Sequence, residues 1–527
     1  MIINRATVCI LTAGKGTRMG TYSEIINKAL LPVKQKAIIS HIMDKFPKDS
    51  EYVIALGYMK DQVKNYLNIV HGDRDIKFVE VDNWEGTGSG PGYSMICCKL
   101  HLNKPFYFVS CDTLWNNNID MDLDENWLGL STVSYEESYR YCNIKVEHGD
   151  VAVDVLDKEA GTWPPYKAFI GLWYIKDHDI FWEGLKLKNF IKGEHQVSNG
   201  IKALIASRKT KAVDIDWIDV GDKGKYQDLI SKYENYDFSK SNEFLYIVEK
   251  KVVKFFSDSS ITEKRVQKSK LKPVVFPLID KIYGQFYGYN FVEGTTLYNY
   301  NDKVIFRNLL FWLKEHLWTN VEINTDEVRS TCKKFYYDKT VERIKLLYNR
   351  CNIADKQTVV NGVKLGKTKE LLSRVPWENL FNGIPVFFHG DLQFDNILYN
   401  KIKDTFILLD WRQEFGGHVE WGDLYYDLAK LYGGIVLNYD FIKLNLLYYH
   451  ETGNEITFDF AQRFLTSDYL SILDEFVISN GWDVKKVHML VPLIYLNMSP
   501  LHHDPFNKML YSMGRLMLSN ELNSENK

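Results

Sequence analysis

The sequence predicts an α/β fold for its first half and a two-lobed α+β fold for its second half. Up to about residue 230, short β-branched or apolar runs alternate with longer amphipathic runs, as in a sheet covered by helices. Between residues 229 and 241 the alternation gives way to polar residues, which favours a domain boundary there. After residue 302, long helical patterns dominate. The 527 residues suffice for about three cores of ordinary size.

Strands in the first half are predicted from short runs rich in β-branched and aromatic residues. They fall at residues 6–11, 52–56, 76–80, 106–110, 128–133, 143–146 and 167–175. Helical periodicity between them predicts helices that include residues 37–46, 61–70 and 92–98. Because strands alternate with helices, we expect a mostly parallel sheet with helices on both faces.

The second half begins with strand-like runs and continues with helices. The first runs lie at residues 244–248, 252–256 and 283–291, and two more interrupt the helical part at 386–388 and 406–409. We therefore predict a first domain over residues 1–235, a linker over 236–241 and a second domain over 242–527. Within the second domain, a small sheet lobe spans about 242–297 and a helical lobe about 298–527.

Charge and composition exclude several classes of function. With 65 Lys and Arg against 68 Asp and Glu, the net charge is −3, so a nucleic-acid partner is not expected. The seven cysteines include no Cys-x-x-Cys pair and indicate reduced thiols in a cytoplasmic protein. No run reaches the ~20 apolar residues of a membrane span. The composition does not reveal an oligomeric state.

A glycine-rich segment follows the first predicted strand directly. Glycines between a strand and a helix let backbone N–H groups approach phosphate. The segment matches neither the Gly-x-Gly-x-x-Gly pattern of dinucleotide sites nor a phosphate loop that ends in Gly-Lys-Ser/Thr. Alone, it could be an ordinary turn. Its residues 11–20 read Leu-Thr-Ala-Gly-Lys-Gly-Thr-Arg-Met-Gly.

Four more segments follow in a fixed order. They are Asn-Lys-Ala-Leu-Leu-Pro-Val at 27–33, Gly-Thr-Gly-Ser-Gly at 86–90, Asp112 after the strand at 106–110, and Trp-Ile-Asp-Val-Gly at 217–221. Together with the glycine-rich segment, this set resembles the nucleotidyltransferases that join a nucleoside triphosphate to a phosphorylated sugar or alcohol. The resemblance covers roughly residues 1–235 and implies a Rossmann-like domain.

The resemblance implies a role for each segment. Arg18 would bind the leaving pyrophosphate, Lys28 would neutralise the attacked α-phosphate, and Asp112 and Asp219 would share Mg²⁺, which prefers carboxylate and phosphate oxygens. Glu194 could shape the acceptor pocket or simply begin a helix. The segment 86–90 departs from the commoner Gly-Thr-Ala or Gly-Gly-Ala versions, which leaves the base open. The nucleotide would be held by Leu11, Ala13, Gly14, Lys15, Gly16, Thr17, Gly86, Thr87, Gly88 and Ser89.

A second motif lies in the helical half. Residues 387–398 read Phe-Phe-His-Gly-Asp-Leu-Gln-Phe-Asp-Asn-Ile-Leu, which places Asn396 five positions after Asp391, and Asp410 follows the strand at 406–409. This parallels the protein-kinase plan, in which a loop Asp accepts the hydroxyl proton while an Asn and a second Asp hold Mg²⁺. With Gly-Asp-Leu-Tyr-Tyr-Asp-Leu-Ala at 422–429, it resembles the aminoglycoside phosphotransferase and choline/ethanolamine kinase superfamily, over roughly residues 242–520.

By this resemblance, Asp391 is the catalytic base, Asn396 and Asp410 are the Mg²⁺ ligands, and Asp427 braces the catalytic loop. Lys254 could contact the phosphates of ATP, and a surface lysine is the open alternative. Glu293 lies in a segment that resembles the hinge holding adenine.

The acceptor pocket of this second site is predicted from aromatic residues. Trp411, Trp421 and Tyr425 could hold an ammonium group by cation–π attraction, and the alternative is that they pack in the core.

Two such sites on one chain form a short pathway, because a kinase makes the phosphomonoester that a nucleotidyltransferase consumes. The favoured interpretation is that ATP phosphorylates a small alcohol and that CMP from CTP is then transferred, with Mg²⁺, to give a CDP-amino alcohol for surface polysaccharide or lipid decoration. A sugar or polyol kinase joined to a UDP-, dTDP- or CDP-forming transferase is the main alternative. The second half could also be a resistance kinase, or one half could be an inactive regulatory or scaffolding module.

Overall fold

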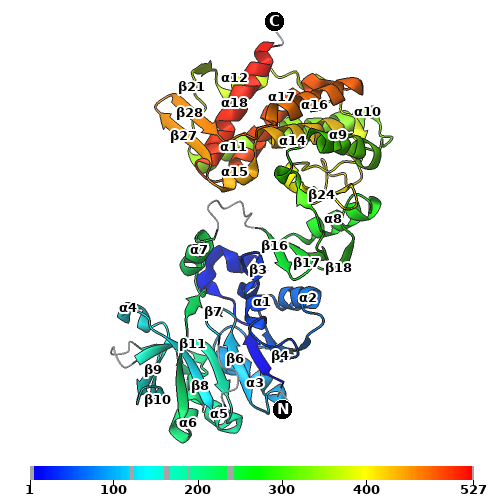
Figure 1. Cartoon of the computed structure of the whole chain (residues 1–527). Coiled ribbons are helices and arrows are strands. Elements are labelled where there is room, and N and C mark those ends of the chain that lie inside the picture. Colours follow the sequence, from blue (N-terminus) through cyan, green and yellow to red (C-terminus); the bar gives the residue numbers. More distant parts are fainter. Residues whose placement is uncertain are drawn as a thin grey trace. The chain divides into compact units, whose positions relative to one another are not determined.

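The computed structural model describes residues 5–118, 124–159, 166–187, 190–191, 193–233 and 242–524 (Figure 1). The predicted linker at 236–241 lies outside these residues. The chain divides into two compact units, and each is described by itself. The described residues of the first unit fall in 5–233, 242–258 and 281–288, and those of the second unit fall in 259–280 and 289–524.

A mixed sheet is the centre of the first unit. Among the described residues it has nine strands, in the order β5-β4-β1-β6-β11-β8-β14-β10-β9. Their bounds are β1 Thr7–Leu11, β4 Glu51–Leu56, β5 Asp75–Glu80, β6 Phe106–Ser110, β8 Asn126–Ser131, β9 Cys142–Glu147, β10 Val151–Asp157, β11 Tyr166–Ile175 and β14 Thr210–Asp214.

The sheet is less parallel than the sequence predicts. Strands β5, β4, β1 and β6 pair in parallel, as do β8 and β14. The strand β11, however, runs antiparallel to both β6 and β8, and β9 and β10 form an antiparallel pair. A short turn at residues 148–150 joins β9 to β10, and connections this short can only return the chain as an antiparallel neighbour.

Helices cover both faces of this sheet, as predicted. On one face α1 (Ile38–Met43), α2 (Lys60–Val70) and α7 (Lys223–Ser231) share a core with alternate residues of β1 and β4. On the other face α3 (Pro91–Cys98), α5 (His178–Leu185) and α6 (Ser198–Ser207) pack on the remaining residues of the same strands. Smaller elements are η1 Thr17–Glu24, η2 Lys28–Leu30, β2 Pro32–Val33, β3 Lys36–Ala37, η3 Lys99–His101, β7 Thr113–Trp115, α4 Tyr135–Ser138, β12 Phe190–Ile191, β13 Glu194–His195 and β15 Trp217–Asp219.

A hairpin from the second half of the sequence packs into the first unit. Strands β16 (Glu243–Val248) and β17 (Lys251–Phe256) pair in antiparallel fashion and belong to a four-stranded sheet with β19 (Phe286–Asn290) and β18 (Ile279–Tyr283). Apolar side chains of β16 and β17 belong to the same hydrophobic core as those of α1 and α2. The hydroxyl of Tyr246 donates a hydrogen bond to the carbonyl of Leu30, at 2.8 Å.

The second unit consists mainly of helices, in agreement with the sequence (Figure 1). The helix α8 (Ser259–Leu271) precedes them, and among the described residues small sheets of two to four strands lie between the helices. The other helices are η4 Leu297–Asn299, α9 Lys303–Trp312, η5 Leu313–Leu317, α10 Thr325–Lys333, η6 Lys334–Asp338, α11 Lys339–Cys351, α12 Thr368–Ser373, α13 Trp377–Leu380, η7 Phe394–Asn396, α14 Leu424–Val436, α15 Tyr439–Lys443, α16 Thr466–Ser479, α17 Val484–Met498, η8 Ser499–Leu501 and α18 Phe506–Ser524. The strands are β20 Thr295–Thr296, β21 Thr358–Val360, β22 Val363–Leu365, β23 Pro385–Val386, β24 Ile397–Asn400, β25 Thr405–Leu408, β26 Gly422–Asp423, β27 Leu447–Thr452 and β28 Glu455–Phe460.

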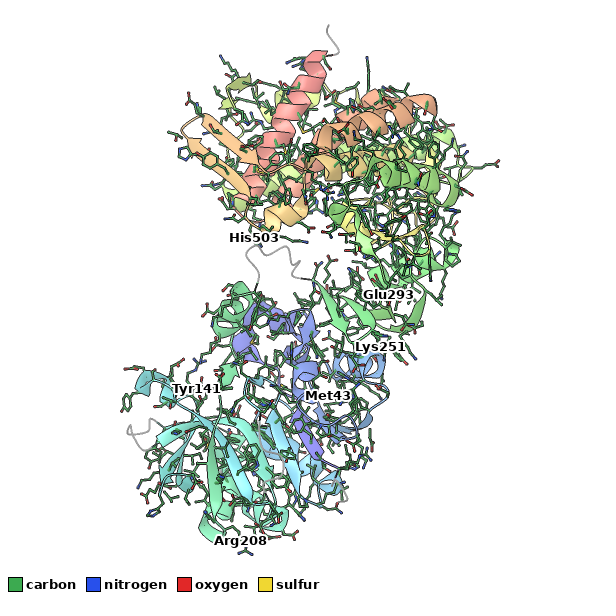
Figure 2. All side chains as sticks on the ribbon, in the orientation of Figure 1. Met43, Tyr141, Arg208, Lys251, Glu293 and His503 are labelled. Carbon is green, nitrogen blue, oxygen red and sulfur yellow. The ribbon has the colours of Figure 1, made fainter. Side chains whose placement is uncertain are left out.

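No helix within the described part of the chain combines the length and the apolar character that a membrane crossing demands. Figure 2 shows the side chains of both units and labels Tyr141 and Lys251 in the first and Glu293 in the second.

Candidate active sites

The glycine-rich segment leaves β1 as an open loop. Gly14, Lys15, Thr17 and Arg18 are exposed, whereas Ala13 is buried. Gly16 adopts a left-handed backbone with φ of 66°, and a Cβ there would lie 3.0 Å from the side chain of Lys28. Glycine therefore lets the loop lie directly against this lysine.

Two carboxylates and an arginine meet around Gly221. A Cβ at this position would lie 3.0 Å from Asp219 Oδ1 and 3.1 Å from Asp112 Oδ2, so these oxygens are at most about 6 Å apart. Arg18 Nη2 is 3.5 Å from the same point. The pairing of β7 with β15 causes this convergence, because Asp112 directly precedes β7 and Asp219 ends β15.

Lys28 is the counter-ion of Asp112. Its Nζ lies 2.8 Å from Asp112 Oδ2, and both side chains are mostly buried. Burial lowers the pKa of the Lys28 ammonium, but the charge of Asp112 outweighs burial and the net pKa is raised. For Asp112, burial raises the pKa, yet Lys28 and Arg18 hold it below its usual value. Both groups are therefore charged at neutral pH.

The carboxylates have the chemistry of a Mg²⁺ site completed by substrate. Mg²⁺ typically takes one or two carboxylates together with phosphate oxygens. Across the described ranges, no group of three or more His, Cys, Asp and Glu side chains could hold a metal alone. The pair Asp112 and Asp219 fits this mode, since the missing ligands would come from a triphosphate.

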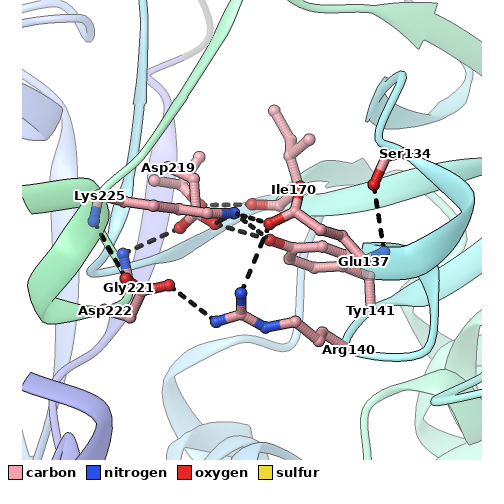
Figure 3. Close-up of polar contacts among 10 residues, drawn as sticks. Ser134, Glu137, Arg140, Tyr141, Ile170, Asp219, Gly221, Asp222 and Lys225 are labelled. Atoms are coloured by element: carbon pink, nitrogen blue, oxygen red, sulfur yellow. Dashed lines mark hydrogen bonds and ion pairs between the residues drawn. The ribbon is translucent and has the colours of Figure 1, made fainter. Parts of the chain in front are cut away.

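A polar network that the sequence did not reveal surrounds Asp219 (Figure 3). Asp219 Oδ2 accepts hydrogen bonds from the Tyr141 hydroxyl and from Lys225 Nζ, both at 2.8 Å. Arg140 Nη2 donates to Asp222 Oδ2 at 2.7 Å, and Glu137 lies 3.1 Å from Lys225. Burial and the Asp219 charge raise the pKa of Tyr141 to about 12, so its hydroxyl stays protonated. These hydrogen bonds hold the Oδ2 atom of Asp219 in place.

The segment 86–90 forms a tight loop against β13. Ser89 is buried and its hydroxyl donates to the Gly86 carbonyl at 2.6 Å, while the His195 amide donates to the Ser89 carbonyl at 2.7 Å. A Cβ at Gly90 would lie 2.7 Å from the His195 carbonyl. Close packing explains why residue 90 is a glycine. Gly86, Thr87 and Gly88 are exposed or half-buried. Their predicted contact with the nucleotide stays a prediction.

Glu194 begins β13 and forms an ion pair that the sequence did not indicate. Lys158 Nζ lies 2.9 Å from Glu194 Oε2. Burial raises the pKa of Glu194, but Lys158 and the charge of Arg18 bring the net value below normal. The charge of Arg18 thus acts on the predicted acceptor residue as well as on Asp112.

In the second unit, Asp427 braces the predicted catalytic loop. Its two carboxylate oxygens accept hydrogen bonds from the backbone amides of His389 and Gly390, both at 2.7 Å. Trp318 Nε1 donates to it at 3.1 Å. Asp427 is fully buried, and these contacts hold the backbone at His389 and Gly390, while its predicted role beside a catalytic Asp391 stays a prediction.

Asp391 and Asn396 lie on the loop that Asp427 supports, and Asp410 lies beside it after β25. Asn396 Nδ2 donates to the backbone carbonyl of Asp391 at 2.9 Å, and the Leu409 amide donates to the Asn396 carbonyl at 2.7 Å. Asp410 follows Leu409 and pairs with the buried Arg265 of α8. Asp391 Oδ1 lies 2.6 Å from the buried Lys430 Nζ. The side-chain oxygens of Asn396 and Asp410 are suitable Mg²⁺ donors.

Arg265 and Lys430 are the basic residues that sequence reasoning missed in this unit. A signal for Lys430 existed, because it follows the bracing Asp427 by three positions and so lies on a neighbouring face of α14. Arg265 carried no such signal, since its partner is 145 residues away.

The predicted aromatic acceptor residues are packed in the core. Trp411 is completely buried and its Nε1 donates to the Arg265 carbonyl at 2.9 Å. The ring of Trp421 stacks on His418, and the Tyr425 hydroxyl accepts a hydrogen bond from the Asp483 amide. Contact with an acceptor would require these rings to move.

Lys254 and Glu293 lie on separate units. Lys254 is on β17 opposite Leu245, and the backbone carbonyl of Glu293 accepts a hydrogen bond from Asn400 Nδ2 at 3.1 Å. Their predicted roles toward ATP stay predictions.

Comparison with known proteins finds relatives of the N-terminal part of the chain. Residues 8–119 match the family described as MobA-like NTP transferase domain. The chain is 26% identical over 219 residues to the bifunctional protein GlmU of Methanococcus maripaludis, which covers 40% of this chain and 50% of that protein. It is 25% identical over 227 residues to UTP–glucose-1-phosphate uridylyltransferase AglF of Haloferax volcanii, covering 40% of this chain and 90% of that protein.

A further relative is choline-phosphate cytidylyltransferase of Streptococcus pneumoniae, 26% identical over 199 residues that cover 34% of this chain and 82% of that protein. The chain spans about half the length of the GlmU proteins that it matches. The N-terminal part of the chain is thus an α/β domain of the nucleotidyltransferase type.

Proposed function

We propose that the chain is a bifunctional enzyme that phosphorylates a small alcohol with ATP and then transfers a nucleotidyl group to the product. The convergence of Arg18, Asp112 and Asp219 around Gly221, with Lys28 on Asp112, is the observation that carries the nucleotidyltransferase half. The arrangement of Asp391 and Asn396 on the loop braced by Asp427, with Asp410 after the neighbouring strand β25, supports the kinase half.

At the first site, the phosphate oxygen of the acceptor attacks the α-phosphorus of the triphosphate, and the bond to the leaving pyrophosphate breaks. Lys28 and Arg18 supply positive charge for the phosphates, and such charge stabilises a developing oxyanion best where water is excluded. When bound by Asp112 and Asp219, Mg²⁺ would neutralise further phosphate charge.

At the second site, the alcohol oxygen attacks the γ-phosphorus of ATP, the bond to the β-phosphate oxygen breaks, and ADP leaves. Asp391 takes the hydroxyl proton, for which its partly exposed carboxylate is accessible. When bound by Asn396 and Asp410, Mg²⁺ would offset the charge of the transferred phosphoryl group.

CTP is our first choice for the second nucleotide, because a kinase for small alcohols combines naturally with an activity like that of choline-phosphate cytidylyltransferase. UTP is the alternative, which the likeness to a UTP-using uridylyltransferase favours. Linking the two sites in one chain raises the local concentration of the phosphomonoester.

Phosphorus NMR tests both halves together. The protein is incubated with Mg²⁺, ATP, one of CTP, UTP, GTP and dTTP, and one alcohol from a panel of choline, ethanolamine, glycerol, glycerate, polyols and hexoses. The proposal expects a phosphomonoester signal followed by a diphosphate diester and pyrophosphate for one pairing. The absence of a diester in every pairing contradicts the coupled activity.

Asp391→Asn separates the two halves. We expect the variant to lose phosphorylation by about 10²–10⁴-fold, the range that a general base contributes, and to retain nucleotidyl transfer to added phosphomonoester. The measurement is the initial rate of each step. Equal loss of both rates would show that the variant acts on the whole fold, and unchanged phosphorylation would rule out Asp391 as the base.

A further inference from the structure

Several basic side chains lie near Asp391 and act on one another electrostatically, and we call them the basic cluster. It consists of Lys339 and Arg343 of α11, Arg412 and Lys430. Lys430 contacts Asp391 directly. Arg412 packs against the catalytic loop, since its amide donates to the His389 carbonyl at 2.9 Å and a Cβ at Gly390 would lie 2.5 Å from Arg412 Cβ.

Two members of the basic cluster share one aromatic ring. Lys339 Nζ lies 3.9 Å from the centre of the Phe335 ring, and the guanidinium of Arg412 lies 5.1 Å from it. The Phe335 ring stacks on Phe415 and meets the edge of Tyr426. The protein's own cations therefore already use the aromatic surface beside Asp391, and an ammonium ligand would compete with them.

Positive charge in the basic cluster exceeds negative charge. Lys339 and Arg343 are four positions apart on one face of α11, a spacing at which like charges repel. Burial lowers the pKa of Lys339, and the charges of Arg412, Arg343 and Lys430 lower it further.

The charge of Asp391 acts on Lys339 and Lys430, and that of Glu342 acts on Arg343. Among the described residues, Lys339, Arg343 and Arg412 form no ion pair. Lys430 is paired with Asp391, so the other three basic side chains are available to an anion.

We propose that the alcohol phosphorylated at this site carries an anionic group, a carboxylate, phosphate or phosphonate, which the basic cluster binds. The inference rests on the proposed kinase function and specifies its substrate class. The acceptor hydroxyl must come within about 3 Å of Asp391 to give up its proton, so the rest of a small alcohol lies within reach of the surrounding side chains. A guanidinium and an ammonium bind carboxylate or phosphate through charge-assisted hydrogen bonds.

The test compares phosphorylation of glycerate and 2-hydroxyethylphosphonate with that of glycerol, ethanolamine and choline. We expect kcat/KM to be at least tenfold higher for the anionic alcohols. Lys339→Met and Arg343→Gln should raise the KM of the anionic alcohol about tenfold or more, as expected for a lost charge-assisted hydrogen bond, and leave the KM of ATP within twofold. Lys339→Arg keeps the charge and should retain most of the affinity.

Lys345→Met is the matched control, because Lys345 is exposed on another face of α11. Preference for a neutral or cationic alcohol overturns the proposal. So does a rise in the KM of ATP alone, which would assign the basic cluster to the phosphates of the nucleotide.

If no alcohol is phosphorylated, the kinase function itself fails, and calorimetry then decides about the basic cluster. Saturable binding of glycerate or 2-hydroxyethylphosphonate that Arg343→Gln weakens and Lys345→Met does not would support an anion site. Equal binding by all variants, or none, would overturn it.

Discussion

At the scale of single residues, Gly221 leaves the space in which the groups of the first site meet, because glycine has no side chain. The carboxylates of Asp112 and Asp219 and the guanidinium of Arg18 all approach the space that a side chain at this position would fill. Its backbone lies outside the left-handed region, so glycine is needed here for space. A methyl group would separate the two carboxylates or turn them away from each other.

We expect Gly221→Ala to lower nucleotidyl transfer about 100-fold, the scale of loss that follows a misplacement of reacting groups by about 1 Å. Phosphorylation by the second unit should be unchanged. The readout is the rate of pyrophosphate release with CTP or UTP and a supplied phosphomonoester. Gly224→Ala is the control, because its new Cβ meets only ordinary contacts. Equal rates for the two variants would exclude a site at Gly221.

The sequence predicted the residues of this site that sit in ordered motifs, and it missed their partners. Asp112 was recognisable from its place after a strand, and Asp219 from its place in an ordered motif. Lys225 and Tyr141, which hydrogen-bond to Asp219, were not, because Tyr141 lies 78 residues from Asp219 in the chain. Such pairs arise only when the sheet brings distant loops together.

At the scale of elements, one buried carboxylate joins several strands of the sheet. Glu51 opens β4 and forms ion pairs with Lys77 of β5 and Lys104, which precedes β6. Burial raises the pKa of Glu51, but the two lysines outweigh it and lower the value to about 2. The ionised form is therefore stabilised by the fold.

We expect Glu51→Gln to destabilise the sheet at pH 7 by roughly 2 kcal/mol. Because the folded pKa lies below the unfolded one, Glu51 contributes fully above pH ~4.5 and loses its contribution as the pH falls toward 2. Hydrogen exchange of the β4 amides measures the effect. The difference between wild type and variant should shrink over this pH range. Glu80→Gln removes an exposed pair and should change little.

A constant difference between pH 7 and pH 3 would contradict the assignment of the stabilising charge to Glu51. No sequence pattern indicated this contact, although β4 itself was predicted within one residue. Strands with continuous apolar runs were predicted well, whereas β10 and β14 were missed. Asp154 interrupts the apolar run of β10, and β14 contains only two apolar residues, Ala212 and Val213.

At the scale of the whole molecule, the sequence pattern changes near residue 240. The boundary between the two compact units does not coincide with this change. The hairpin β16–β17, predicted as part of a small kinase lobe, contributes to the core of the first unit. Tyr246 also donates to the carbonyl of Leu30, which ends the short η2 helix that begins with Lys28. Sequence pattern shows which elements form, and tertiary packing decides to which core they belong.

We therefore expect a fragment of residues 1–235 to fold poorly and a fragment of residues 1–258 to fold. Removing the hairpin exposes the core that it covers, through the loss of Phe244, Tyr246, Val248, Val253 and Phe255. At about 1.5–3 kcal/mol for each buried side chain, the loss approaches roughly 10 kcal/mol, an upper estimate that is comparable with the whole stability of a domain.

Near-ultraviolet circular dichroism and dye binding of the two fragments measure this difference, because an exposed core loses fixed aromatic packing and binds hydrophobic dyes. In the full chain, Tyr246→Ala should lower nucleotidyl transfer through Leu30 and the neighbouring Lys28, whereas Tyr283→Ala, an exposed residue of β18, should not. If fragment 1–235 melts as cooperatively and at the same temperature as fragment 1–258, the hairpin adds nothing to this core. In that case a cut at residue 235 would separate the two proposed activities. The packing of Tyr246 instead predicts that a working N-terminal fragment must keep β16 and β17.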